Sequence, residues 1–289
     1  MKVNRYLTIN LSFLILSLSL LACKQRLEKK ASSPEIKEFK YFSKNVKDTF
    51  TISVQLPLAF QQHPERKYPV VVLTDANFYF PMLAPVLHQY EVGGLLPPLI
   101  LVGIGYKSFP IMNSLRVRDD LYPAAIPSDE MKAPGGGKMF YQFITKELLP
   151  EINAKYPSQQ NNRTLLGHSF GGYFSLFSLL EQINNSRDDF SGFVSASPSL
   201  WYNNFYLNQL PQKLIKYPIK DTLNIVLTVG GAEEKQWSVE PVKKLSGQFG
   251  KLNLPRIKFS NEIYNNLTHM DVGLLSFTRG LELIYNKSK

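Results

Sequence analysis

Apolar residues along the chain gather in short continuous runs, with longer periodic stretches between them. The continuous runs are rich in Val, Ile and Leu, a composition typical of strands that are buried on both faces of a parallel sheet. Five segments show it: 68–76, 97–105, 163–167, 190–197 and 222–231. An earlier segment, residues 49–57, alternates apolar and polar positions instead, which predicts a half-buried antiparallel strand.

Helical periodicity fills several of the gaps between these runs. Residues 138–156 repeat an apolar side chain every four positions, which predicts an amphipathic helix. Residues 170–183 are apolar nearly all round, as expected of a helix packed centrally on a sheet, and residues 271–285 predict a C-terminal amphipathic helix. Because strands alternate with helices, we expect a mostly parallel, doubly wound α/β sheet with helices on both faces, preceded by one or two antiparallel strands.

The N-terminus does not fit this alternation. Lys2 and Arg5 precede an apolar run over residues 7–21, an arrangement typical of a secretory signal peptide. The run ends in Leu-Leu-Ala-Cys23, which resembles a bacterial lipobox, and the resemblance implies that Cys23 becomes the lipidated first residue of the mature protein. The alternatives are an uncleaved membrane anchor, or a plain signal with an incidental cysteine.

This reading divides the chain of 289 residues into three parts. We expect a lipoprotein signal peptide over 1–22, a lipid-anchored tether over 23–35 and one α/β domain over 36–289. The predicted location is the bacterial cell envelope, in the periplasm or at the outer membrane.

Charge and cysteine content restrict the partners. The formal net charge is +10, and it falls to +8 when the signal and its two basic residues are removed. This excess could favour an anionic surface or an acidic substrate, but scattered solvated lysines account for it better. Nucleic acid is not expected, because the chain is exported and lacks an aromatic-basic motif. The only cysteine, Cys23, excludes an internal disulfide and a cysteine-based zinc cluster, and no metal or organic cofactor is implied.

A polar interruption separates run 163–167 from the helix over 170–183. There Gly167-His168-Ser169-Phe170-Gly171 fits the pattern G-x-S-x-G between a strand and a helix. In that context the serine occupies a strained turn, so the positions two residues away on either side must be small. A glycine-rich turn with a capping serine is the structural alternative, but the context predicts Ser169 as a nucleophile.

The histidine count selects the general base. In hydrolases with this turn the base follows both the serine and the acid along the chain. Of the four histidines, which are His63, His88, His168 and His269, only His269 lies after Ser169. His168 is adjacent to the nucleophile, but we expect its side chain to point elsewhere.

The third member of the triad is expected after strand 222–231. Glu233 and Glu234 stand directly there, and Glu233 is the first choice with Glu234 as fallback. A solvated acidic turn is the alternative role for either residue. The other acids lie at poorer positions: Asp188, Asp189, Asp221 and Glu240.

Two backbone amides are expected to stabilise the oxyanion. The first is the amide of Phe170, at the N-terminus of the helix after Ser169, where the helix dipole also favours negative charge. A second donor is expected from Ala76 or Asn77, in the loop after strand 68–76. The same loop is compatible with an Asx turn that begins a helix.

Taken together, these segments resemble the α/β-hydrolase "putative esterase" family, which includes esterase D and the enterobactin-type ferric siderophore esterases. The resemblance is carried by VVVLTDANFYF, RVRDDLYP, FITKELLPEINAKYP, RTLLGHSFGGYFSLFSLL, SASPSLWYNN, VGGAEE and THMDVGLLSFTRGLELI. It implies an α/β-hydrolase domain and a Ser-His-acid hydrolase with Ser169 and His269 at the matching positions and Glu233 as the acid. Asp75-Ala76-Asn77 departs from the Asp-Gly pair of many relatives, which puts the oxyanion loop in question.

Two of the family-like segments are expected to shape the substrate site. Ser197, Trp201 and Tyr202 follow the strand after the turn, so they are expected near the mouth of the cleft, although packing is the commoner role for such a tryptophan. Arg116 and Arg118 are expected either to hold an anionic part of the substrate or to form ion pairs with the acidic residues that follow them.

The sequence therefore predicts a lipid-anchored serine carboxylic-ester hydrolase that acts through an acyl-enzyme. Siderophore and acylated-carbohydrate esters are the expected substrate classes. Acyl transfer of the mycolyltransferase type is one alternative. A catalytically inactive ligand-binding lipoprotein is the other, and the presence of Ser169, His269 and an acidic loop argues against it.

Overall fold

The structure is a computed structural model that describes residues 34–252 and 254–286. The expected signal peptide, Cys23 and the tether up to residue 33 lie outside these residues. The described residues from 35 onward form one compact unit. Within its described part no helix is both long and apolar enough to cross a membrane.

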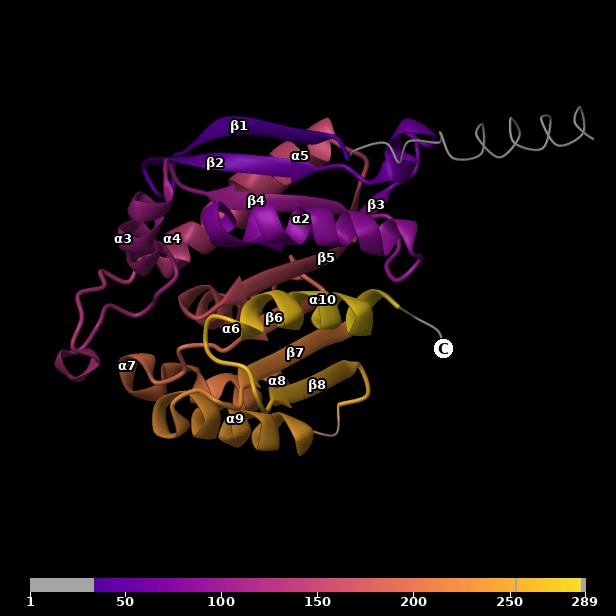
Figure 1. Cartoon of the computed structure of the whole chain (residues 1–289). Coiled ribbons are helices and arrows are strands. Elements are labelled where there is room, and N and C mark those ends of the chain that lie inside the picture. The colour runs from indigo at the N-terminus through magenta and orange to yellow at the C-terminus, as the bar shows by residue number, and fades with distance from the viewer. Residues whose placement is uncertain (1–33, 253, 287–289) are drawn as a thin grey trace, which may run out of the picture. The chain divides into compact units, whose positions relative to one another are not determined.

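Eight strands form one sheet in the order β1-β2-β4-β3-β5-β6-β7-β8 (Figure 1). From β4 to β8 neighbouring strands are parallel, whereas β2 is antiparallel to both β1 and β4. The strands are β1 (Ile36–Ser43), β2 (Asp48–Gln55), β3 (Tyr68–Leu73), β4 (Ile100–Gly105), β5 (Ser158–His168), β6 (Gly192–Ala196), β7 (Leu223–Gly230) and β8 (Ile257–Tyr264). The mostly parallel sheet and the antiparallel start are both as expected.

Every continuous apolar run is a strand in the structure, and the alternating segment 49–57 is β2. The buried strands carry side chains on both faces, because successive residues of a strand point in opposite directions. In β5, Leu165 belongs to one apolar core and Leu166 to another on the opposite face. The sheet is thus covered on both sides.

Helices cover both faces of the sheet. The core that contains Leu166 includes residues of α2 and α10, and the core that contains Leu165 includes residues of α4, α6, α8 and α9. The helices are α2 (Ala76–Val92), α3 (Phe109–Asp119), α4 (Gly137–Gln142), α5 (Leu149–Lys155), α6 (Phe170–Asn184), α7 (Tyr202–Phe205), α8 (Leu210–Ile215), α9 (Glu240–Gly250) and α10 (Val272–Tyr285). Shorter 3₁₀ turns lie at Leu58–Gln61, Pro127–Asp129 and Tyr206–Gln209, and π-helical turns at Phe143–Leu148 and Lys235–Val239.

Two of the three expected helices match closely, as α6 and α10. The third, over 138–156, is α4 and α5 joined through the π-helical turn Phe143–Leu148. Apolar periodicity does not predict the extent of α2, which holds Pro81 and Pro85 inside 17 helical residues, although the alternative role of the loop after 68–76 allows a helix to begin there. Proline normally interrupts a helix, but burial of the α2 face that includes Leu83 and Leu87 outweighs this cost.

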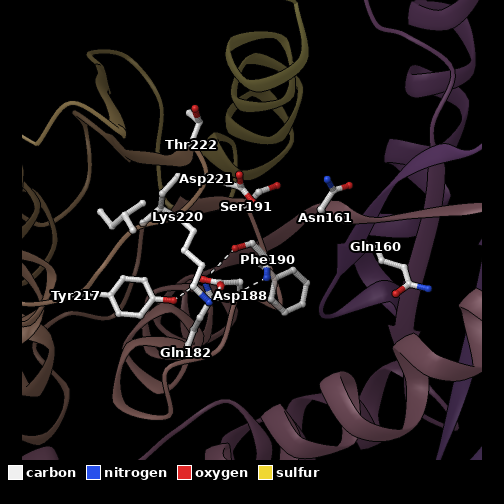
Figure 2. A pocket seen from close by; sticks show the side chains of 12 residues that line it. Gln160, Asn161, Gln182, Asp188, Phe190, Ser191, Tyr217, Lys220, Asp221 and Thr222 are labelled. Atoms are coloured by element: carbon white, nitrogen blue, oxygen red, sulfur yellow. Dashed lines mark hydrogen bonds and ion pairs between the residues drawn. The ribbon is translucent and has the colours of Figure 1, made fainter.

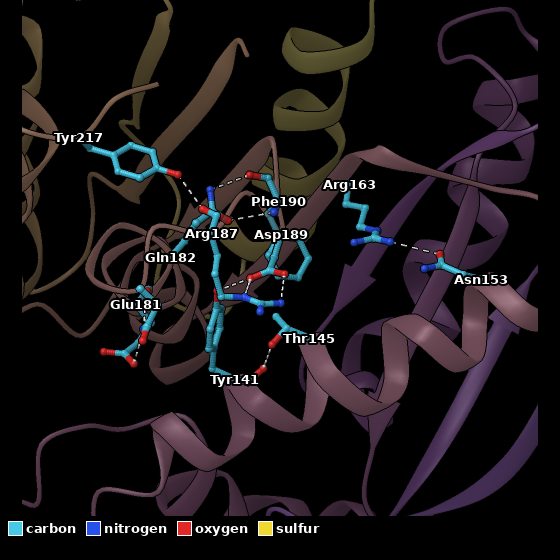
Figure 3. A network of polar contacts seen from close by, with 11 residues as sticks. Tyr141, Thr145, Asn153, Arg163, Glu181, Gln182, Arg187, Asp189, Phe190 and Tyr217 are labelled. Atoms are coloured by element: carbon cyan, nitrogen blue, oxygen red, sulfur yellow. Dashed lines mark hydrogen bonds and ion pairs between the residues drawn. The ribbon is translucent and has the colours of Figure 1, made fainter. Parts of the chain in front are cut away.

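A polar network secures the loop between α6 and β6 (Figure 3). Asp189 accepts hydrogen bonds from Arg187 Nε at 2.7 Å and Arg187 Nη2 at 2.6 Å, and from the Tyr141 hydroxyl at 2.6 Å. Because Asp189 is buried and Tyr141 belongs to α4, the network joins α4 to the segment that follows α6. It fixes the far end of the helix that begins after Ser169.

Candidate active site

Four strands end at one edge of the sheet, and a polar residue follows each of them. Asp75 follows β3, Ser169 follows β5, Ser197 follows β6 and Glu233 follows β7. The carboxyl ends of parallel strands are where open α/β sheets bind their ligands. The residues singled out in the sequence therefore lie at the functional edge.

Ser169 occupies a strained turn between β5 and α6. Its φ of 61° and ψ of −117° lie in a region that side-chain-bearing residues rarely adopt. A Cβ on Gly167 would lie 1.9 Å from the carbonyl oxygen of Gly171, and a Cβ on Gly171 would lie 2.5 Å from the hydroxyl oxygen of Thr74. Gly167 is thus required by close approach of the backbone, and Gly171 by close approach of the Thr74 side chain, as the turn pattern predicts.

A cavity of about 120 Å³ contains Ser169 and His269 in its wall. Much of the remaining wall is apolar: Phe78, Phe109, Met112 and Met270. His269 lies in the loop between β8 and α10, and 41% of its side chain is exposed. Nucleophile and base candidates therefore share one small, open cleft.

The ring of His269 is held by Glu233. Its Nδ1 donates to Glu233 Oε2 at 2.8 Å, and the Ser197 hydroxyl donates to the same oxygen at 2.6 Å while lying 3.0 Å from Nδ1. The other carboxylate oxygen accepts the backbone N–H of Gly230 at 2.8 Å. Because Nδ1 is engaged, Nε2 is the ring nitrogen left for a reacting group.

The Glu233 carboxyl is ionised in this setting. Its side chain is only 1% exposed, and burial, the largest influence, opposes the charged form. The hydrogen bonds from His269, Ser197 and Gly230 outweigh burial, so the pKa of Glu233 lies below its usual value. Glu234, in contrast, accepts the backbone N–H of Trp237 at 2.5 Å and caps the π-helical turn there.

Amide donors converge on the same edge from two helix N-termini. Phe170 is the first residue of α6, and Ala76 and Asn77 are the first two of α2, so their N–H groups have no partner within their helices. The Asn77 side chain donates to the carbonyl of Tyr106 at 2.9 Å and accepts its N–H at 2.6 Å. This pair of bonds ties the start of α2 to the end of β4.

Arg116 braces this loop. It donates from Nε and Nη2 to the two oxygens of Asp75 at 2.9 and 2.7 Å, and from Nη2 to the carbonyl of His168 at 3.2 Å. Its guanidinium also lies 5.1 Å from the ring centre of Phe170. Arg116 lies in the cavity wall, but its positive charge is paired with the Asp75 carboxylate.

Two residues expected to contact substrate have other roles in the structure. Arg118 pairs with Asp119 at 2.7 Å and with Asp48 at 2.8 Å, which is the ion-pair alternative. Tyr202 is fully buried, and its hydroxyl donates to the carbonyl of Pro123 at 2.7 Å. Trp201 is partly exposed and packs edge-on against Phe170 with ring centres 6.3 Å apart, next to the cavity rather than in its wall.

No pattern in the sequence indicates which residues Ser197 and His168 contact. The sequence predicts only that Ser197 lies near the cleft mouth, whereas in the structure its hydroxyl bridges Glu233 and His269. His168 points to the face of α2 and α10, as alternation along β5 requires, and its Nε2 lies 2.7 Å from the carbonyl oxygen of His269. Alternation along a strand predicts on which face of the sheet the His168 side chain lies. It does not predict that His269 is its partner, because the two residues are about a hundred positions apart in sequence.

A second cavity, of about 180 Å³, lies at the opposite edge of the sheet (Figure 2). It is lined by residues that precede or begin β5, β6 and β7, among them Asn161, Ser191 and Leu223. Tyr217, Lys220 and Asp221 border it as well. It holds none of the candidate catalytic residues, and residues 34–252 and 254–286 contain no His, Cys, Asp and Glu group arranged to hold a metal ion.

Comparison with known proteins identifies the family of the chain. Residues 43–262 match the family model described as "Putative esterase". The chain is 31% identical to the ferri-bacillibactin esterase BesA of Bacillus subtilis over 205 residues, which cover 66% of this chain and 68% of that protein. It is 29% identical to a siderophore enterobactin esterase of Emericella nidulans, over 54% of this chain and 55% of the relative.

Solved structures share the fold. The BES protein from Bacillus cereus superposes with a TM-score of 0.78 at 26% identity, covering 89% of this chain and 97% of that one. An IroE-like serine hydrolase from Shewanella oneidensis gives a TM-score of 0.75 at 24% identity, covering 87% and 80%. The α/β-hydrolase fold expected from the sequence is thereby confirmed. The chain belongs to the "Putative esterase" family and is a serine carboxylic-ester hydrolase.

Proposed function

We propose that Ser169, His269 and Glu233 form the catalytic triad of this esterase. The observation that carries the proposal is the 2.8 Å bond between His269 Nδ1 and the buried Glu233 carboxylate, in a loop whose histidine shares a cavity with Ser169. Glu233 fixes the tautomer of His269 so that Nε2 is free to accept a proton, and it stabilises the imidazolium that results. The strained turn of Ser169 presents its hydroxyl to the cleft.

The reaction proceeds in two steps. His269 Nε2 removes the proton of Ser169 as Oγ attacks the ester carbonyl, and the collapsing tetrahedral intermediate expels the alcohol, which takes that proton. His269 then deprotonates a water molecule that attacks the acyl-enzyme, and Ser169 recovers its proton as the carboxylic acid leaves. The N–H groups of Phe170 and of Ala76 or Asn77 stabilise the oxyanion in both steps.

The substrate class we propose is a siderophore ester. Its support is the names of the relatives, which include a ferri-bacillibactin esterase and a siderophore enterobactin esterase. The apolar side chains of Phe78, Phe109 and Met270 around the cleft suit an aromatic acyl group. Arg116 contributes little free charge for an anionic group, because it is paired with Asp75.

We further propose that the mature protein is lipid-anchored in the cell envelope through Cys23. The support is the sequence Leu-Leu-Ala-Cys23 after an apolar run, since these residues lie outside the described part of the chain. Labelling of cells with a palmitate analogue tests it. Label should appear on the wild type and be lost in Cys23→Ala, and label retained in Cys23→Ala would refute the anchor.

The activity is tested by turnover of defined esters. The wild type should hydrolyse a catecholate trilactone and short p-nitrophenyl esters, and Ser169→Ala should not. Equal turnover by Ser169→Ala, or none by the wild type on any ester, would contradict the proposal. A rate that rises with added alcohol or sugar acceptor, with an acylated acceptor as product, would instead favour acyl transfer, and preference for an acylated xylan over the trilactone would move the substrate to carbohydrate esters.

A further inference from the structure

His168 stands between the nucleophile and the loop of the base, and the mechanism above does not use it. It is the last residue of β5, directly before Ser169. Its side chain lies on the face where α2 and α10 pack, beside the ring of Tyr79 at 5.6 Å between ring centres. The ring of His269 is 4.5 Å from that of His168. His168 therefore contacts the candidate base His269, and the next residue along the chain, Ser169, is the candidate nucleophile.

The contact with His269 is made through the backbone. His168 Nε2 lies 2.7 Å from the main-chain carbonyl oxygen of His269. A carbonyl oxygen only accepts hydrogen bonds, so the proton of the neutral His168 imidazole must be on Nε2. The bond therefore runs from a residue of the rigid sheet to a residue of a loop.

The His168 imidazole takes up no second proton, and so stays neutral, over the pH range in which an esterase works. Its side chain is buried, with 5% of the residue exposed. Burial lowers the pKa of His168 to about 3, with a smaller contribution from the neighbouring His269. The other charged or titratable groups that face it are Arg116, Glu233 and Tyr79. A neutral donor adds no charge beside His269, which must itself become cationic during turnover.

We propose that His168 is a positioning residue that fixes the general base by its backbone, while Glu233 fixes it by its ring. The inference rests on the proposed role of His269. Without the bond from His168, His269 itself is held only through its ring, and the nearest backbone tie of its loop to the strand ends is the bond from the Ala232 N–H to the Leu267 carbonyl, two residues earlier. The distance between His269 Nε2 and Ser169 Oγ is then set less tightly. Misplacement of a catalytic group by about 1 Å costs on the order of 10²-fold in rate.

Two substitutions of His168 distinguish the effect of losing its hydrogen-bond donor from the effect of changing its side-chain volume. His168→Leu removes the donor and keeps an apolar filler, whereas His168→Gln places an amide N–H close to the position of Nε2. His88→Leu is the matched control, because His88 is also buried but lies on α2 outside the cleft. Each variant is assayed for kcat and KM on p-nitrophenyl acetate at several pH values, after its folded fraction has been measured by denaturant unfolding.

We expect kcat of His168→Leu to fall about 10²-fold with KM changed less than about threefold, and His168→Gln to recover most of that loss. His88→Leu should keep the wild-type kcat. The acid limb of the wild-type pH–rate profile should follow a single proton, because His168 takes up none there. If folded His168→Leu retains wild-type kcat, or if His168→Gln gives no recovery, the positioning role is overturned while the esterase assignment stands. Absence of Ser169-dependent turnover in the wild type would overturn both.

A measurement on the unsubstituted protein keeps the test decisive if His168→Leu does not fold. The chain has only four histidines, so each ring can be resolved by ¹⁵N NMR. His168 should show a protonated Nε2 and an unprotonated Nδ1, unchanged from pH 5 to pH 9. A proton on Nδ1, or titration within that range, would overturn the inference.

Discussion

Arg116 and Asp75 form a bidentate ion pair in the wall of the active-site cavity, with donor–acceptor distances of 2.9 and 2.7 Å. Their side chains are 14% and 4% exposed, respectively. The pair joins α3 to the loop that begins α2, and Arg116 also reaches the carbonyl of His168. The arginine that the sequence offered for an anionic substrate is thus part of the frame that holds the candidate oxyanion loop.

Removal of the Asp75 charge should leave the largely buried Arg116 guanidinium with only its longer carboxylate contact, to Asp120, whose Oδ2 lies 3.7 Å from Nε. We expect Asp75→Asn to lower the free energy of unfolding by about 2–4 kcal/mol, somewhat below the range for a fully buried pair because Arg116 is partly exposed. Glu151→Gln, which breaks the exposed pair with Lys155, should change it by less than about 0.5 kcal/mol. Urea unfolding measures both, and equal effects of the two substitutions would contradict the bracing role of Arg116.

The two adjacent glutamates after β7 should differ sharply in their effect on catalysis. Glu233→Gln loses the carboxylate that orients His269, so kcat should fall about 10²–10⁴-fold. Glu234→Gln alters only the cap at Trp237, and kcat should stay within about threefold of the wild type. Steady-state hydrolysis of a p-nitrophenyl ester measures both variants. If kcat fell more in Glu234→Gln than in Glu233→Gln, Glu234 would be the acid of the triad instead.

The hydrogen bonds on Glu233 should also make folding stability depend on pH. Its pKa in the folded protein lies below the ordinary value of 4.5. A depressed folded pKa means that the stabilisation is fully present above the unfolded pKa and is lost as pH falls through the folded one. The wild type should therefore exceed Glu233→Gln in stability by more at pH 7 than at pH 3. A difference that stays constant, or grows toward acid, would show that the carboxylate is not stabilised as described.

The glycine before the nucleophile should tolerate no side chain. In Gly167→Ala the new Cβ would meet the carbonyl of Gly171 at 1.9 Å, so the turn must distort and unfolding should become easier by more than about 3 kcal/mol, with loss of activity. Gly247→Ala is the matched control in α9, where nothing lies within 4 Å of the Cβ. It should stabilise the protein by about 0.5–1 kcal/mol. Thermal unfolding compares the two, and a Gly167→Ala variant as stable as Gly247→Ala would refute the account of the turn.

Much of the framework could be read from the sequence because it depends on local order. Buried parallel strands need continuous apolar runs, and the turn of Ser169 needs its two glycines, so both left clear patterns. Chain order alone singled out His269 as the base candidate. The extent of α2 could not be predicted in this way, since Pro81 and Pro85 argue against a helix locally and only burial against the sheet favours it.

The interactions that refine the site could not be read in this way. The contacts of Ser197 with Glu233, and of His168 with His269, join residues 36 and 101 positions apart. They exist because β5, β6 and β7 end side by side, which no spacing rule in the chain records. The same holds for Arg118 and Tyr202, whose partners Asp48 and Pro123 come from other parts of the fold.

The most direct test of the account is covalent labelling of the nucleophile. A fluorophosphonate forms a stable adduct only with an activated serine, so one equivalent should attach to the wild type and mass spectrometry of its peptides should place it on Ser169. Labelling should be absent in Ser169→Ala and at least about 10²-fold slower in His269→Ala. Ser178→Ala, which removes a buried hydroxyl of α6 outside the cavity, should label at the wild-type rate. An adduct on another serine, or none on the wild type, would contradict the central claim.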